Sequence, residues 1–236
     1  MIFGILGGLT AALINSADYL FSARFLIYHK SPVRLLVISS VLMMIISLPA
    51  MFLLVPFSTI PCLWKFLAET VLASTFFLIG QGSCFAAMRF FEASRLSSLL
   101  GLKILVLSAI FMLSGHLLNF WQITAVCIAA AAAVMFNWSG TQPVPWKGWA
   151  LLASTLIGFS LTDMVETSLV RQIHEYSQFS QLRSALATVP LLYSALGILL
   201  LPGLIFYRPD KDQLCKAFPH AILWLVSQVF LLSCYA

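Results

Sequence analysis

Residues 2–23 read IFGILGGLTAALINSADYLFSA, and this stretch decides the fold class. A helix needs about 20 mostly apolar residues to cross a membrane, and this stretch has that length but carries Asp18. Two later apolar stretches carry Lys103 and Asp163 in the same way. A charge near the bilayer centre costs roughly 3 kcal/mol and therefore faces a protein interior or a watery cavity. We expect a polytopic membrane protein with a polar interior.

The composition argues against both a soluble domain and a nucleic-acid binder. Hydrophobic residues make up 61% of the 236 residues and charged residues only 9%, which is too little to cover a soluble surface. The net charge of +5 comes with 13 basic residues that are scattered between apolar runs, whereas nucleic-acid binding needs a basic stripe or patch. We therefore expect the lipid bilayer as a partner and no nucleic acid.

Eight apolar windows are long enough to span a membrane, which predicts an all-α bundle of transmembrane helices. They cover approximately residues 2–23, 35–57, 66–88, 97–116, 120–138, 149–170, 184–206 and 220–236. The connections between them are short, so the sequence leaves no room for a soluble domain.

Basic residues are distributed unevenly between the two ends of these helices. Nine fall on the side opposite the N-terminus: Arg24, Lys30, Arg34, Arg89, Arg95, Lys147, Arg208, Lys211 and Lys216. Three fall on the same side as the N-terminus: Lys65, Arg171 and Arg183. Because cytoplasmic loops carry an excess of Lys and Arg, we expect residues 24–34 to be cytoplasmic and the N-terminus to lie outside a plasma (inner) membrane.

The first helix resembles the sixth when the sequence is shifted by 145 residues. The matches are Thr10 with Thr155, Asn15 with Ser160, Asp18 with Asp163, and Ser22 with Thr167. The last three polar residues of each set are spaced by three and four, which places them on one helix face. Since five helices separate each element from its partner, the two copies should insert in opposite directions, as in the inverted repeats of secondary transporters.

This repeat predicts a first five-helix unit over residues 1–140 and a second unit over 141–236 that stops after three helices. The correspondence of Ser83-Cys-Phe-Ala86 with Ser233-Cys-Tyr-Ala236 places the end of the chain inside the second copy. Repeat symmetry then predicts a complete protein of about 288 residues and ten helices. Either the chain is a fragment or the protein is naturally truncated, in which case a homodimer would cover the open helix faces.

One segment resembles a known family. The run Glu92-Ala-Ser-Arg-Leu-Ser-Ser-Leu-Leu-Gly-Leu-Lys103, the following Ser114-Gly115-His116 and Gln122 are similar to EamA-like members of the drug/metabolite transporter superfamily. The resemblance implies ten helices in two inverted repeats that move small metabolites. The run from Leu102 to Phe111 also resembles the fourth helix of nucleotide-sugar transporters in that superfamily, and there a lysine contacts the substrate, which points to Lys103.

Depth along the helices groups the buried charges. At about 1.5 Å per residue, Lys103 lies roughly 12 Å from Arg95 and Asp18 roughly 9 Å from Arg24, on the same side of the membrane. We therefore expect Lys103 and Asp18 to pair in a shared cavity. Asp163 is the pseudo-symmetric carboxylate, and its basic partner is expected in helices that the chain does not contain.

These residues predict a secondary-active permease for a small polar or anionic metabolite, working by alternating access between the two repeats. The expected substrate-binding residues are Lys103, Asp18, Asp163, Asn15, Ser160 and Gln81. Lys103 would attract an anionic group, while Asp18 or Asp163 would take up and release a proton. Gln81 would line the cavity from the third helix.

Structural alternatives stay open for the same side chains. Asp18 and Lys103 could form a purely structural salt bridge, since charges inside bundles are often paired. Asp163 could be capped by Ser160 and Thr167, because Ser and Thr commonly form hydrogen bonds within membrane helices. We expect Glu166 to be an interfacial residue that extends toward the membrane surface.

Two other functional classes are open as alternatives. An intramembrane enzyme acting on a lipid or peptide could use Ser114, His116 and the buried acids, although their spacing matches no catalytic motif. A truncated protein of this family without transport activity is the other alternative.

The sequence shows no signal for metal or cofactor chemistry. The five cysteines lack metal-ligand spacing and no phosphate-binding loop occurs, so we expect no enzyme activity, no cofactor and no metal.

Overall fold

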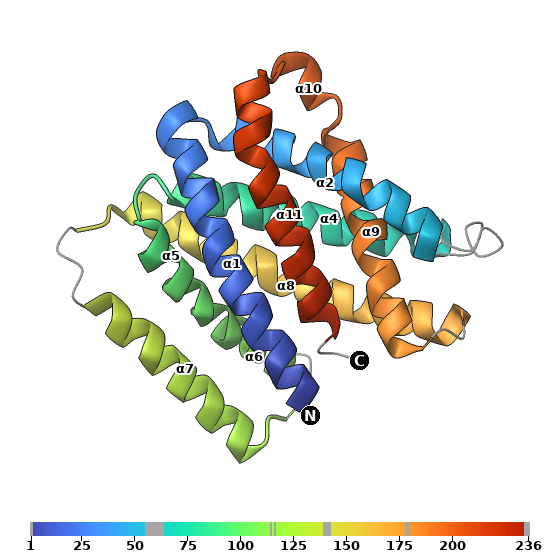
Figure 1. The fold of residues 1–236 in the computed structure, drawn as a ribbon. Helices are drawn as coiled ribbons and strands as arrows, with labels where there is room; N and C mark the ends of the chain where they lie inside the picture. The colour runs from blue at the N-terminus through green and yellow to red at the C-terminus, as the bar shows by residue number, and fades with distance from the viewer. Residues whose placement is uncertain are drawn as a thin grey trace.

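The structure is a computed structural model that describes residues 2–54, 64–113, 115, 117–138, 143–177 and 180–233. In these residues it is a bundle of helices without strands (Figure 1), which confirms the predicted all-α fold. The helices are α1 (Ile2–His29), α2 (Pro32–Leu54), η2 (Trp64–Phe66), α4 (Leu67–Ala87), α5 (Ala93–Leu99), η3 (Leu100–Leu102), α6 (Lys103–Leu113), α7 (Phe120–Trp138), α8 (Trp146–Ser177), α9 (Gln181–Leu200), α10 (Gly203–Phe206) and α11 (Lys211–Ser233).

Each of the eight apolar windows falls on one of these helices as far as the residues are described. The fourth window combines α5, the short 3-10 turn η3 and α6 into one helical span. Within the described residues, six spans are long and apolar enough to cross a membrane: α2, α4, α5–α6, α8, α9 and α11. An apolar bundle of this kind is an integral membrane protein, because only lipid solvates so many apolar helix faces.

Several helices are longer than their apolar windows. The last window begins at His220, but α11 begins nine residues earlier, at Lys211. Similarly, α8 continues to Ser177, past the predicted end at residue 170. The polar residues of these terminal turns lower the local hydropathy without ending the helix. The predicted boundaries were therefore wrong at both places, and residues expected near helix ends lie well inside the helices.

The packing of the helices is symmetric between the two predicted repeats. The most extensive contacts join α4 to α8, α2 to α9 and α1 to α11, and α1 and α11 lie side by side in Figure 1. The first three long helices are α1, α2 and α4 in the first repeat and α8, α9 and α11 in the second. If each helix is replaced by its equivalent in the other repeat, the α4–α8 contact becomes the α11–α1 contact and the α2–α9 contact stays the same. This pattern is what a two-fold repeat requires, while the boundary near residue 140 stays a prediction.

Backbones approach each other closely where α4 crosses α8. A Cβ atom added to Gly158 would lie 2.7 Å from the Cα atom of Gly80, so only glycine fits at this point. One turn away, the hydroxyl groups of Ser83 and Ser154 are 2.9 Å apart. Small residues and short hydroxyl contacts allow close packing of membrane helices, and here they fix the two helices against each other.

The helix ends that carry many of the predicted cytoplasmic charges lie together. The Arg89 guanidinium, just after α4, donates a hydrogen bond of 2.6 Å to the carbonyl oxygen of Lys30, between α1 and α2. His29 at the end of α1 lies 3.4 Å from Asp212 at the start of α11. These contacts agree with the prediction that the connecting segments share one side of the membrane.

An aromatic cluster fills the centre of the bundle. The rings of Phe77, Phe159 and Trp224 pack against one another with centroid distances of 5.4 to 6.1 Å. The Trp224 Nε1 atom donates a hydrogen bond of 2.7 Å to the hydroxyl group of Tyr193. All four side chains are buried. They join α4, α8, α9 and α11, and Phe77, Phe159 and Trp224 also line the cavity described next.

Candidate functional site

A cavity of about 250 Å³ lies between helices of the two predicted repeats. It is lined from α1, α4, the α5–α6 span, α8 and α11. The lining residues are Ala12, Asn15, Ser16, Tyr19, Phe77, Ser97, Leu100, Gly101, Lys103, Phe159, Thr162, Asp163, Glu166, Trp224, Gln228 and Leu231. We call this space the central cavity. It combines an aromatic wall with one basic side chain, Lys103, and two acidic side chains, Asp163 and Glu166.

The central ion pair joins Lys103 to Asp163. The Lys103 Nζ atom lies 2.7 Å from the Asp163 Oδ2 atom, and the side chains are 30% and 13% exposed. Lys103 is the first residue of α6, directly after the 3-10 turn η3, and Asp163 lies in the middle of α8. The expectation that Asp163 pairs with a residue beyond this chain is therefore wrong.

The prediction that Asp18 pairs with Lys103, which was based on their similar depth, is wrong. Its Oδ1 atom lies 2.5 Å from the Nδ1 atom of His220 on α11, and neither side chain is exposed. The same His220 nitrogen lies 2.9 Å from the Ser22 hydroxyl group. Asp18 faces α11 whereas Lys103 faces α8, so similar depth did not bring the two together. Both roles assigned to an Asp18–Lys103 pair, functional or structural, are excluded by this geometry.

His220 is the ionisable residue that the sequence analysis missed. The predicted apolar window begins at His220, and the sequence pattern gave this residue no role. Because α11 starts at Lys211, His220 lies nine residues inside the helix, about 14 Å along its axis. The rings of Phe85 and Trp224 pack around it at centroid distances of 5.3 and 6.2 Å. Residues 211–219 continue the helix although they are partly polar, and extending the predicted helix through them would have placed His220 in its interior.

The remaining predicted site residues are divided between the cavity and the packed interior. Asn15 lines the central cavity, and its buried Oδ1 atom has no hydrogen-bond partner among the described residues. Ser160 instead donates a hydrogen bond of 3.4 Å to the carbonyl oxygen of Lys103. Gln81 is buried away from the cavity lining. The predicted contact of Ser160 and Gln81 with a solute in this cavity is not supported by their positions.

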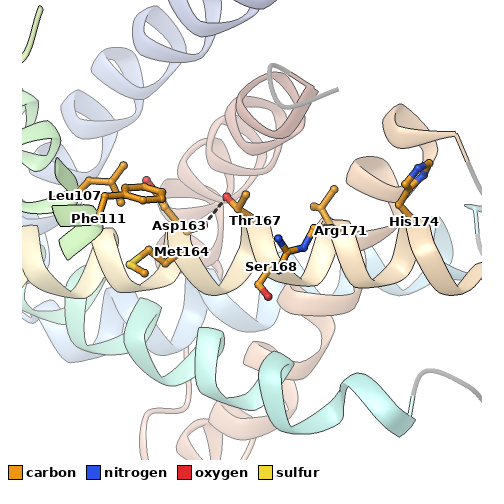
Figure 2. A pocket seen from close by; sticks show the side chains of 9 residues that line it. Leu107, Phe111, Asp163, Met164, Thr167, Ser168, Arg171 and His174 are labelled. Carbon is orange, nitrogen blue, oxygen red and sulfur yellow. Dashed lines mark hydrogen bonds between the residues drawn. The ribbon is translucent and has the colours of Figure 1, made fainter. Parts of the chain in front are cut away.

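The proposed capping of Asp163 is also absent from the described contacts. The Thr167 hydroxyl group donates to the carbonyl oxygen of Asp163 at 2.7 Å and not to its carboxylate (Figure 2). Ser160 points to Lys103, as described above. The Asp163 carboxylate is therefore held by the lysine and not by neighbouring hydroxyl groups.

Glu166 lies in the cavity wall and not at the membrane interface. It is only 3% exposed, and it lines the same cavity as Asp163, one turn earlier on α8. No hydrogen bond or ion pair joins its side chain to another residue that the structure describes. The interfacial prediction was wrong because α8 runs on to Ser177, which places Glu166 about 16 Å from the end of the helix.

A second space, a groove of about 390 Å³, follows α8 from Asp163 to His174. Figure 2 shows Asp163, Thr167, Arg171 and His174 following one another along α8, with Phe111 of α6 at the inner end. Asp163 lines both this groove and the central cavity. Asp163 of the ion pair therefore borders both the central cavity and a groove that leads toward one end of α8.

Ser114 and His116, the residues considered for an enzyme, lie outside the described residues. Comparison of the chain with protein-family models, with curated proteins and with solved structures finds no match. The fold and the geometry of the cavity are therefore the basis for a functional proposal.

Proposed function

We propose that this protein is a secondary-active transporter of a small polar metabolite, with the central cavity as its solute site. The observation that carries the proposal is the ion pair of Lys103 and Asp163 in the wall of a cavity inside an apolar bundle. Removing two charges from water is costly, and a buried ion pair seldom stabilises a fold more than apolar side chains would. Ionisable residues inside membranes typically mark solute or ion pathways.

The position of the cavity supports the same function. In secondary transporters built from inverted repeats, the solute site lies where the repeats meet, near helices whose regular geometry is interrupted. Here the cavity lies between α1 and α5–α6 on one side and α8 and α11 on the other. The 3-10 turn η3 interrupts the α5–α6 span immediately before Lys103. Short 3-10 segments within a helix often mark hinges.

The alternating-access hypothesis follows from this arrangement. Rocking of the two repeats against each other would open the cavity first to one side and then to the other. Asp163, in the cavity, and Asp18, in its buried pair with His220, are the candidate proton-coupling groups. We extend the proposal to membership of the EamA-like family and to a plasma (inner) membrane location with the N-terminus outside.

Counterflow in proteoliposomes tests this function. Vesicles containing the purified protein are loaded with unlabelled solute and assayed for uptake of tetramethylammonium, alanine or succinate, which represent a cation, a zwitterion and an anion. We expect protein-dependent counterflow of at least one solute. Lys103→Ala should lower it about tenfold or more, because the loss of one partner leaves Asp163 with an uncompensated charge.

Lys147→Ala is the matched control, since Lys147 is an exposed lysine at the start of α8. Its counterflow should equal that of the unmodified protein. Equal counterflow by Lys103→Ala would remove the ion pair from the solute site. Absence of counterflow for all three solutes would contradict the transport proposal for solutes of this size.

A further inference from the structure

We infer that Glu166 makes the central cavity a binding site for an organic cation with a small ammonium head group. This inference deepens the proposed function and rests on the central cavity being the solute site. It differs from the sequence-based expectation of an anionic solute. Three features of the cavity carry it: the balance of its charges, the lack of a partner for Glu166, and the aromatic wall.

The cavity lining holds one more acidic than basic side chain. Among the described lining residues, Lys103 is the one basic side chain, and its ammonium group already lies 2.7 Å from the Asp163 carboxylate. The two charges compensate each other. Glu166, in its ionised form, then leaves one negative charge in excess. An anionic solute would have to displace Asp163 from Lys103, whereas a cation can pair with the ionised form of Glu166 without breaking that ion pair.

Glu166 is placed to act on a solute. Its side chain lines the cavity and is 3% exposed, yet it has no hydrogen-bond or ion-pair partner among the described residues. A buried charge without a partner is costly. A bound ammonium group would supply that partner with a charge-assisted contact, which is stronger than a contact between neutral groups.

The aromatic wall completes the chemistry of the site. Phe77, Phe159 and Trp224 line the cavity in mutual ring contact, and Tyr19 lines it from α1. The faces of aromatic rings attract cations, and quaternary ammonium groups are recognised by several rings together. The volume of about 250 Å³ lies below the usual range for drug-sized ligands, so a small head group fits.

Binding of tetramethylammonium to the whole chain in lipid nanodiscs tests the inference by calorimetry. The anion trimethylacetate has a similar branched shape and serves as the probe of opposite charge. We expect the unmodified protein to bind tetramethylammonium and to bind trimethylacetate at least tenfold more weakly. Glu166→Gln, which keeps the shape and removes the charge, should weaken tetramethylammonium binding about tenfold or more.

Two further variants separate the charge of Glu166 from its effect on folding. Glu166→Asp retains a carboxylate and should keep part of the affinity. Glu92→Gln removes an exposed acid at the start of α5 and should leave binding unchanged. Folding of each variant is checked by its helical circular dichroism and by its elution as a single species, so a loss of binding can be assigned to the site.

Three outcomes overturn the inference: no tetramethylammonium binding by the unmodified protein at millimolar concentration, equal binding by Glu166→Gln, or stronger binding of trimethylacetate. The transport proposal fails separately. Binding through Glu166 without counterflow of any solute would refute transport and keep the cation site. Counterflow of succinate without tetramethylammonium binding would support transport and refute the cation site.

Discussion

The Nδ1 atom of His220 on α11 lies 2.5 Å from the Oδ1 atom of Asp18 on α1, although 202 residues separate them in the sequence. Neither side chain is exposed, and the Ser22 hydroxyl group contacts the same nitrogen. This buried pair joins the first helix of one predicted repeat to the third helix of the other. Its counterpart at the protein surface is the pair of His29 with Asp212, whose carboxylate side chain is 62% exposed.

We predict that Asp18→Ala and His220→Ala each lower the free energy of unfolding by about 3 kcal/mol, because each leaves a buried polar group without its main partner. The measurement is equilibrium unfolding in mixed detergent micelles. The double variant should lose less than the sum of the two single losses. Asp212→Ala, which removes an exposed aspartate from a similar pair, should cause little change. Additive losses in the double variant would show that the two side chains act independently.

The ion pair of the cavity predicts a charge-swap effect. Lys103→Asp places two carboxylates together, and Asp163→Lys places two ammonium groups together, so each should lower the thermal unfolding temperature. The variant that carries both exchanges restores opposite charges and should recover stability, with a coupling energy of about 1 kcal/mol or more. Unfolding followed by circular dichroism in micelles gives the values. A double variant less stable than both single variants would contradict direct pairing.

The crossing of α4 and α8 predicts a strong response to one methyl group. Gly158→Ala places a Cβ atom 2.7 Å from the Cα atom of Gly80, which forces the helices apart, and should cost about 1 to 3 kcal/mol. Gly82→Ala is the control on α4, because its Cβ atom would meet the Leu36 side chain at an ordinary 3.4 Å. Unfolding in micelles should rank Gly158→Ala as clearly less stable. Equal stability of the two variants would show that the crossing can widen without cost.

The distribution of basic residues predicts the orientation in the membrane. In a variant without the native cysteines, a cysteine at position 211 should react with a membrane-impermeant maleimide only after the cells are opened. A cysteine at position 65 should react in intact cells. Lys65 and Lys211 are both exposed in the structure, so each position is accessible to the reagent. The opposite labelling pattern would reverse the proposed topology.

Apolar windows were sufficient to predict the positions of the helices. A run of about 20 apolar residues has few alternatives to a membrane helix, because no other local structure satisfies the backbone in lipid. The ends were less predictable. Lys211 and Lys216 belong to the first turns of α11 although they are polar, and a helix can continue past the apolar region that defines its window.

The partners of the buried charges could be predicted only in part. Sequence spacing gives depth and helix face, and it correctly marked Lys103 and Asp163 as interior residues. It does not say which helix stands opposite a given face. That information depends on how α1 packs against α11 and α6 against α8, so the pairing of Asp18 with His220 and the exposure of Glu166 to the cavity came only from the structure.

The three residues of η3 have a mechanical consequence for the ion pair. A 3-10 turn advances about 2.0 Å and 120° per residue, whereas an α-helix advances about 1.5 Å and 100°. Rewinding Leu100–Leu102 into α geometry would shorten the span by about 1.5 Å and twist Lys103 by about 60° relative to α5. Such a screw motion of a single turn would shift the base of the Lys103 side chain relative to Asp163, while α5 and α6 keep their own hydrogen bonds.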